Sequence, residues 1–225
     1  MAKEYRLTLP ISEADARQLQ CGDAVYVSGI VHTMRDMGHR RTVEMMARGE
    51  KLPFDLTNGA LWHCGPIVKK NAAGKWETVS AGSTTSSRFT ALGSQLIKDL
   101  KVRLTIGKGT MHKQAADTMS EVGSVFLNST GGAASLYAGQ IEEVVDVHWT
   151  DLGLPEAIWV LRVKDLGPLV VGIDSHGESI FVKIGRQMKA NLVSIYEKSG
   201  IRADYDLAYL PKRVAGKASK GGDSC

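Results

Sequence analysis

The chain has 225 residues, enough for a substantial buried core, and one compact domain is the expectation for this length. Apolar residues make up 43% and charged residues 23%, as in ordinary globular proteins, and no apolar run approaches the roughly 20 residues of a membrane span. The net charge of +4 comes partly from the basic C-terminal end. Because no basic stripe is interleaved with aromatic residues, a nucleic-acid partner is disfavoured.

The N-terminus lacks the apolar core of a signal peptide, so we expect a cytoplasmic protein with no membrane contact. The cysteines, Cys21, Cys64 and Cys225, lie far apart in the sequence, without a Cys-x-x-Cys pair or a histidine cluster. Three separate thiolates can hold an iron–sulfur cluster, but buried or incidental thiols are the favoured interpretation. We therefore expect this chain to bind no metal by itself.

Predicted strands and helices alternate in the first half of the chain. β-Branched and aromatic residues predict a strand over 24–31, and a helix follows from Arg35 or Asp36 to about Arg48, with Asp36 as its cap. Short strands are predicted over 60–64 and 76–80. A Ser- and Thr-rich turn over 82–88 then leads into an amphipathic helix over 89–100.

The second half begins with a strand over 102–106 and a helix over 113–122. A strand over 124–128 and a short helix come next, followed by strands over 141–149, 157–163 and 169–174 and a closing helix over 184–198. We predict an α/β fold with a mixed sheet, in a single domain over 1–211. The basic stretch over 212–225 has little to bury, and we expect it to be disordered.

The richest candidate for a functional site is the turn that follows Gly82. A run of hydroxyl residues stands there at the mouth of a predicted helix, where free backbone N–H groups and the helix dipole favour a bound anion. Arg88 can add a bidentate pair of hydrogen bonds to a carboxylate. The alternative is a capping loop with a solvated arginine, and these residues alone fit both interpretations.

Three other turns follow predicted strands. Gly107-Lys108-Gly109 allows a ligand to approach closely, although such a sequence is more often a simple turn, and it lacks the spacing of a Walker A loop. Arg35 stands where a strand passes into a helix, a common place for ligand-facing residues, although a capped helix start is the alternative. His39 is more often structural than catalytic. Gly131-Gly132 supplies either backbone donors or close helix packing, and packing is favoured.

These turns supply two arginines, one lysine and a hydroxyl cluster at strand ends. Such a set suits a small dianion. It contains neither the usual general base nor a metal of its own, so the sequence predicts one half of an active site.

The same residues belong to motifs that resemble an iron–sulfur hydro-lyase family, comprising the β subunits of L(+)-tartrate dehydratase and the C-terminal domain of class I fumarate hydratase. The similarity covers about Leu9 to Asn191. The order of the motifs is specific: Gly22-Asp-x-Val-Tyr, Arg35-Asp-x-x-His39, Leu61-x-His-x-Gly65-Pro66, Gly82-x-Thr84-Thr85-Ser86-x-Arg88, Gly107-Lys108-Gly109, Gly131-Gly132-Ala-Ala, and Val147-His-Trp-Thr-Asp-Leu-Gly-x-Pro-Glu156.

The resemblance implies a swivelling β/β/α-type domain and a 4Fe–4S cluster that is ligated by a partner α subunit, not by this chain. Thr84 and Lys108 would be the catalytic residues, with Thr84 at the position of the base. Substrate carboxylates would be bound by Arg35, Arg88 and Lys108 together with Thr85 and Ser86. Supporting residues would be Asp36, His39, Gly131 and Gly132.

The implied reaction is dehydration of a C4 dicarboxylate, active only with the α subunit. Motifs such as His39-Arg40-Arg41 and Val147-His-Trp149 favour L(+)-tartrate, converted to oxaloacetate, over interconversion of malate and fumarate. A non-catalytic dicarboxylate-binding module is the other alternative. Two departures from the family pattern, Ser83 for proline and Phe89 for methionine, remove no polar group. The expected assembly is α2β2, or a homodimer of β in isolation.

Overall fold

The computed structural model describes residues 2–201. The chain divides into two compact units, Met1–Lys183 and Ile184–Cys225, and the strands found among the described residues belong to the first. The predicted basic stretch over 212–225 lies outside the described residues. The elements are β1 (Glu4–Thr8), α1 (Glu13–Gln18), β2 (Ala24–Thr33), α2 (Asp36–Ala47), β3 (Ala60–Trp62), β4 (Ile67–Lys70), β5 (Trp76–Ser80), the 3-10 helix η1 (Ser87–Phe89), α3 (Thr90–Leu100), β6 (Leu104–Gly107), α4 (Lys113–Val122), β7 (Val125–Asn128), α5 (Ala134–Ala138), β8 (Ile141–His148), the 3-10 helix η2 (Thr150–Leu152), β9 (Ile158–Ile173) and α6 (Ile180–Lys198).

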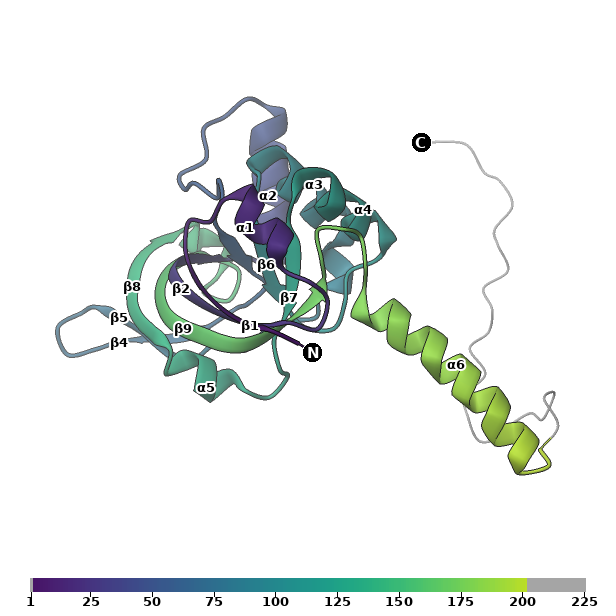
Figure 1. Ribbon diagram of the computed structural model, residues 1–225. Coiled ribbons are helices and arrows are strands. Elements are labelled where there is room, and N and C mark those ends of the chain that lie inside the picture. The colour runs from purple at the N-terminus through teal and green to yellow at the C-terminus, as the bar shows by residue number, and fades with distance from the viewer. Residues whose placement is uncertain (1, 202–225) are drawn as a thin grey trace, which may run out of the picture. The chain divides into compact units, whose positions relative to one another are not determined.

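The first unit is built on a mixed seven-stranded sheet in the order β1-β2-β3-β6-β7-β9-β8. Strands β1, β2, β3, β6 and β7 run parallel, whereas β9 is antiparallel to β2, β7 and β8. Because β9 pairs with both β2 and β7, the sheet closes on itself into a barrel-like arrangement, and the strands curl around one another in Figure 1.

Two apolar cores lie on opposite faces of the central strands. Alternation along β3, β6 and β7 sends Trp62, Ile106 and Leu127 into the barrel and Leu61 and Phe126 to the outer face. The outer face packs against α2, α3 and α4, which gather on one side of the strands (Figure 1). Burial on both faces explains why these short strands read as nearly continuous apolar runs.

The predicted α/β class with a mixed sheet is confirmed, as are the helices at α2, α3 and α4. The strands predicted over 157–163 and 169–174 are one bent strand, β9, whose pairing with β2 shifts register twice. Elements β1, α1 and β4 were not predicted. Arg35, not Asp36, is the residue before the first turn of α2, and no side chain caps that helix by a hydrogen bond.

Among residues 2–201, no helix combines the length and apolar character that crossing a bilayer requires.

Candidate active site

The candidate site lies at the edge of the sheet where parallel strands end. Arg35 follows β2, His63 follows β3, Lys108 follows β6 and Ser129 follows β7. Because these four strands are parallel neighbours, their carboxyl ends meet along one edge. The turn over 81–88 crosses the same edge, since the backbone N–H of Thr84 donates to the His63 carbonyl (2.7 Å) and Thr85 bridges to Lys108.

Arg88 links the hydroxyl turn to the start of α2. Its Nη2 donates to Thr84 Oγ1 (3.1 Å) and forms an ion pair with Asp36 Oδ2 (3.0 Å). The Arg88 and Asp36 side chains are 43% and 49% exposed, and ion pairs in water at this exposure contribute at most about 1 kcal/mol. The guanidinium can therefore exchange Asp36 for a ligand carboxylate at little cost.

Arg35 is held at the other side of the edge by Glu156 and Gly65. Its Nε lies 3.4 Å from Glu156 Oε1 without hydrogen-bond geometry, so the contact is electrostatic. The other oxygen of Glu156 accepts from the backbone N–H of Met37 (2.9 Å). A Cβ on Gly65 would lie 2.6 Å from the Pro155 carbonyl and 2.8 Å from Arg35 Cδ, so only glycine admits this approach.

Lys108 carries the third cation. Its side chain runs past Gly131, where an added Cβ would lie 3.2 Å from Lys108 Cδ, and its ammonium forms no ion pair within residues 2–201. Gly131 thus leaves room for the lysine side chain. The two arginines each face one carboxylate and Lys108 faces none, so the edge keeps a positive surplus that suits an anion.

Ser86 lies beneath this edge and not on it. It is fully buried, and its hydroxyl lies 2.8 Å from His63 Nδ1 and accepts from the Lys108 N–H (3.3 Å), while its own N–H donates to the Lys108 carbonyl (3.0 Å). The polar groups of Ser86 hold the Lys108 turn, and the expectation that Ser86 contacts substrate stays a prediction. Thr85, by contrast, is exposed.

A second hydroxyl chain fixes the start of the turn. Trp62 Nε1 donates to Ser83 Oγ (2.6 Å), the hydroxyls of Ser83 and Ser129 lie 2.5 Å apart, and the Ser129 hydroxyl lies 2.8 Å from the Gly107 carbonyl. The four residues in this series, Trp62, Ser83, Ser129 and Gly107, are all buried. The turn is thus tied to β3, β6 and β7 at once. No side-chain hydrogen bond caps η1 or α3, so the alternative of a simple capping loop gains no support.

His39 and His63 are both completely buried behind the cations, next to Phe89. The His39 ring stacks on Phe89 with 4.7 Å between centroids, and the two imidazoles are 5.2 Å apart. Burial lowers the pKa of His39 to about 4, and burial, with the nearby His39 and Arg88, lowers the pKa of His63 well below its ordinary value. Both rings are neutral at pH 7. The supporting role expected of His39 stays a prediction, and the structure places its ring behind the cations.

The described residues offer no metal centre at this edge. Among residues 2–201, no three His, Cys, Asp or Glu side chains are grouped closely enough to hold a metal ion. Burial raises the pKa of Cys64 to about 12, and it is the main cause that raises the pKa of Cys21 to about 11. Both thiols therefore stay protonated at pH 7, whereas a metal ion binds the deprotonated thiolate.

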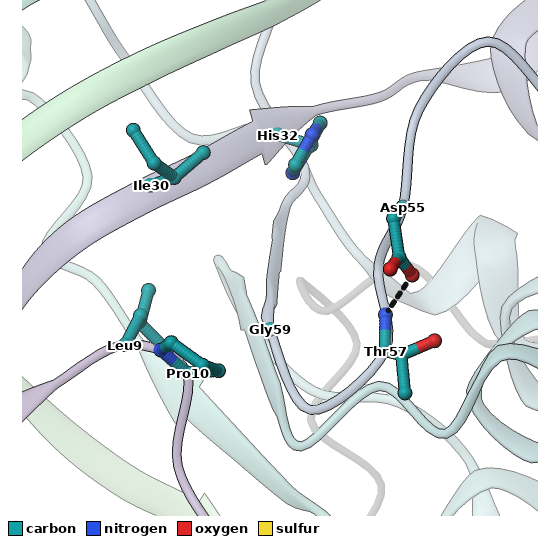
Figure 2. A pocket seen from close by; sticks show the side chains of 7 residues that line it. All are labelled: Leu9, Pro10, Ile30, His32, Asp55, Thr57 and Gly59. Carbon is teal, nitrogen blue, oxygen red and sulfur yellow. Dashed lines mark hydrogen bonds between the residues drawn. The ribbon is translucent and has the colours of Figure 1, made fainter.

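A separate pocket of about 210 Å³ lies between the β1–α1 connection and β2 and is drawn in Figure 2. The backbone N–H of Thr57 donates to Asp55 there (2.8 Å), which holds the pKa of that carboxyl below its usual value. Burial lowers the pKa of His32 to about 4. With a carboxylate, a neutral imidazole and no lysine or arginine in its lining, this pocket is unsuited to a dianion. Its lining residues are Leu9, Pro10, Ile30, His32, Asp55, Thr57 and Gly59.

An edge with two guanidiniums, an ammonium and ordered hydroxyls defines an α/β domain suited to holding a small anion. The chain belongs to the fumarase C-terminus family, whose model matches residues 1–184. This membership confirms the resemblance drawn from the motifs.

Several relatives are about 40% identical to the chain over the aligned residues. The L(+)-tartrate dehydratase subunit beta of Escherichia coli K12 is 41% identical over 177 residues, which is 79% of this chain and 86% of that protein. A putative L(+)-tartrate dehydratase subunit beta of Methanocaldococcus jannaschii is 39% identical over 84% of this chain and 93% of its own length. A putative class I fumarate hydratase of Geobacillus stearothermophilus is 39% identical over 85% of this chain but only 36% of that protein.

Sequence reasoning left several residues of this edge without a role. His63, Gly65 and Glu156 fall within the quoted motifs, yet only the structure shows what they contact. A signal was available for His63, because it lies near the end of the strand predicted over 60–64, much as Lys108 lies just beyond the strand predicted over 102–106. No comparable signal exists for Glu156, which reaches Arg35 from more than a hundred residues away in the sequence.

The packing at Gly107 generates a first prediction. An alanine Cβ there would overlap Ser86 Oγ and lie 2.9 Å from the Phe126 ring, so Gly107→Ala must displace Ser86 and the Lys108 turn. We expect this overpacking to lower the free energy of unfolding by about 1–3 kcal/mol in urea titrations. Gly185→Ala is the control, since no neighbouring atom lies within 4 Å of its added Cβ. Equal unfolding midpoints for Gly107→Ala and the wild type would contradict the packing described.

The buried histidines generate a second prediction, on pH. Because the pKa of His39 is lower in the folded chain than in the unfolded chain, only the unfolded chain gains a proton between pH 6.5 and about 4. The stabilisation is therefore complete above pH 6.5 and is lost as the pH falls. As the pH falls from 6.5 to about 4, we expect His39 to lower the free energy of unfolding by roughly 3 kcal/mol.

Urea titrations at several pH values between 7 and 4 measure this decrease. His39→Asn should flatten the dependence, since its amide cannot gain the proton, whereas His112→Gln, at an exposed position, should leave the slope unchanged. An unchanged slope in His39→Asn would show that His39 is not the group responsible.

Proposed function

We propose that this chain is the β subunit of an iron–sulfur hydro-lyase that dehydrates a C4 dicarboxylate, with L(+)-tartrate preferred. Interconversion of malate and fumarate is the alternative. The observation that carries the proposal is that one turn contacts all three cationic positions at one edge of the sheet: Arg88 bonds to Thr84 and pairs with Asp36, the neighbour of Arg35, while Thr85 bridges to Lys108. The family membership and the names of the relatives, two dehydratase subunits and a hydratase, support the same reaction class.

The proposal includes a partner. Two of the relatives are named as beta subunits, and the chain matches only 36% of the putative fumarate hydratase, which leaves room there for a further domain. We infer that an α subunit holds a 4Fe–4S cluster and assembles with this chain, as α2β2. When bound, such a cluster supplies a Lewis acid for the departing hydroxyl group. The open cationic edge fits the role of the opposite wall.

The chain's own residues then bind and polarise the substrate. Arg35, Arg88 and Lys108 hold the two carboxylates, which sets the orientation of the carbon that loses a proton. Removal of that proton creates negative charge on the adjacent carboxylate. Arg88 and Lys108, fixed by the turns described above, stabilise this charge as it develops.

Thr84 is the proposed base. A threonine hydroxyl is a weak base, and a neighbouring cation must favour its deprotonated form. Arg88 meets this need because its Nη2 donates to Thr84 Oγ1. The hydroxyl proton then passes to a group that we assign to the α subunit.

Reconstitution tests the division between subunits. We expect the purified chain to lack iron–sulfur absorbance and to be inactive alone, and to turn over L-tartrate faster than malate or fumarate after anaerobic mixing with a cluster-bearing α subunit. Steady-state kinetics with the three acids measure the preference. If the isolated chain bound a cluster stoichiometrically and dehydrated tartrate, the proposed division would be wrong.

Substitutions at the edge separate catalysis from binding. Thr84→Ala should lower kcat by at least about 100-fold while dicarboxylate binding is retained, because it removes the base but no cation. Arg88→Ala should lower kcat/KM by a similar factor, whereas Arg40→Ala, at a nearby exposed arginine, should have no effect. Unchanged turnover in Thr84→Ala would remove Thr84 from the mechanism and favour a binding module or a structural subunit.

A further inference from the structure

Two buried imidazoles lie between the main chain of Arg35 and that of Lys108, each bonded to one of the two sides. His39 Nδ1 lies 2.8 Å from the Arg35 carbonyl oxygen, and His63 Nδ1 lies 2.8 Å from Ser86 Oγ, which in turn accepts from the Lys108 N–H. Between these contacts, the two Nε2 atoms are buried and unpartnered within residues 2–201. Phe89 packs against both rings, at 4.7 Å and 4.6 Å between centroids.

The contacts determine which nitrogen of His39 carries the hydrogen. A carbonyl oxygen can only accept, so His39 Nδ1 must donate to Arg35. Because the ring is neutral, its Nε2 is then a bare acceptor.

The hydroxyl of Ser86 determines the tautomer of His63. Ser86 Oγ accepts from the Lys108 N–H, and its own hydrogen needs an acceptor. His63 Nδ1, at 2.8 Å, provides that acceptor, so this nitrogen is bare and the hydrogen of the neutral ring sits on Nε2. The two unpartnered Nε2 atoms are therefore complementary, one a donor and the other an acceptor, in rings with centroids 5.2 Å apart.

We propose that His63 and His39 are positioning residues that keep opposite tautomers, hydrogen on Nε2 of His63 and on Nδ1 of His39, and thereby couple the placement of Lys108 to that of Arg35. The catalytic consequence of this coupling rests on the proposed function. The tautomers themselves do not.

A purely space-filling role does not explain these residues. Burying a polar ring nitrogen without a partner costs free energy, and an apolar side chain would fill the same volume without that cost. His63 also contacts the site through its backbone, because its carbonyl accepts from the Thr84 N–H. One residue thus holds both the proposed base and, through Ser86, the Lys108 turn.

Nitrogen-15 NMR of the histidine side chains tests the tautomers in the wild-type chain at pH 7. We expect His39 to show a protonated Nδ1 and His63 a protonated Nε2, with assignments from His39→Asn and His63→Asn spectra. A protonated Nδ1 in His63, or a doubly protonated ring at either position, would overturn the proposal whatever the chain's activity.

Kinetics of the reconstituted enzyme test the coupling. His63→Leu should lower kcat/KM by about 10- to 100-fold, because the Lys108 turn loses its fixed position. His63→Asn, whose amide can occupy the place of Nδ1 and bond to Ser86, should restore at least half of that loss on a logarithmic scale. His112→Leu, at an exposed position, is the matched control and should leave kcat/KM unchanged.

Repeating the His63→Leu measurement in an enzyme that already lacks Lys108 separates positioning from general destabilisation. If His63 acts through Lys108, His63→Leu should cost less than about twofold more in an enzyme that already carries Lys108→Ala. An equal loss in both backgrounds, or no rescue by asparagine, would overturn the coupling. Should the wild-type enzyme dehydrate no C4 dicarboxylate, the proposed function fails, and the NMR result alone decides the assignment of tautomers.

Discussion

Strand β9 pairs with β2 on one side and β7 on the other, and this double pairing closes the curved sheet whose edge carries the candidate site. Within that sheet, only β3 and β6 separate β2 from β7, and the carboxyl ends of these four parallel strands lie along one edge. The cations that follow β2 and β6 therefore lie at the same edge of the sheet. A flat sheet of the same order would have spread them along its edge.

The site is asymmetric in what it supplies. Guanidinium and ammonium groups are concentrated at its surface, while the imidazoles behind them are kept neutral by burial. Neutral rings add no charge that would compete for the anion, yet they offer hydrogen bonds that hold main-chain turns in place. Exposed ion pairs such as that of Arg88 with Asp36 are weak enough to open for a ligand. Buried neutral contacts thus support exposed charged ones.

Much of the fold and part of the site could be predicted from the sequence, for physical reasons. Buried parallel strands such as β6 and β7 give apolar runs, and glycine-rich turns mark their ends. β1 was missed because Glu4 and Arg6 interrupt a half-exposed strand, and α1 because it has six residues, although Ser12 and Asp15 form a capping box. The pairing of His63 with Ser86 joins residues 23 positions apart and follows only from the folded sheet.

The series of hydrogen bonds from Trp62 through Ser83 to Ser129 limits which substitutions this protein can accept at these positions. Proline, which the resemblance implies for relatives at position 83, has no side-chain acceptor, so it would leave the buried indole N–H of Trp62 unsatisfied at a cost of about 1–3 kcal/mol. Serine at 83 and tryptophan at 62 are therefore epistatic. Homologues that carry the proline should have a different residue at 62, or another acceptor for the indole, and exchange of one position alone between such lineages should be selected against.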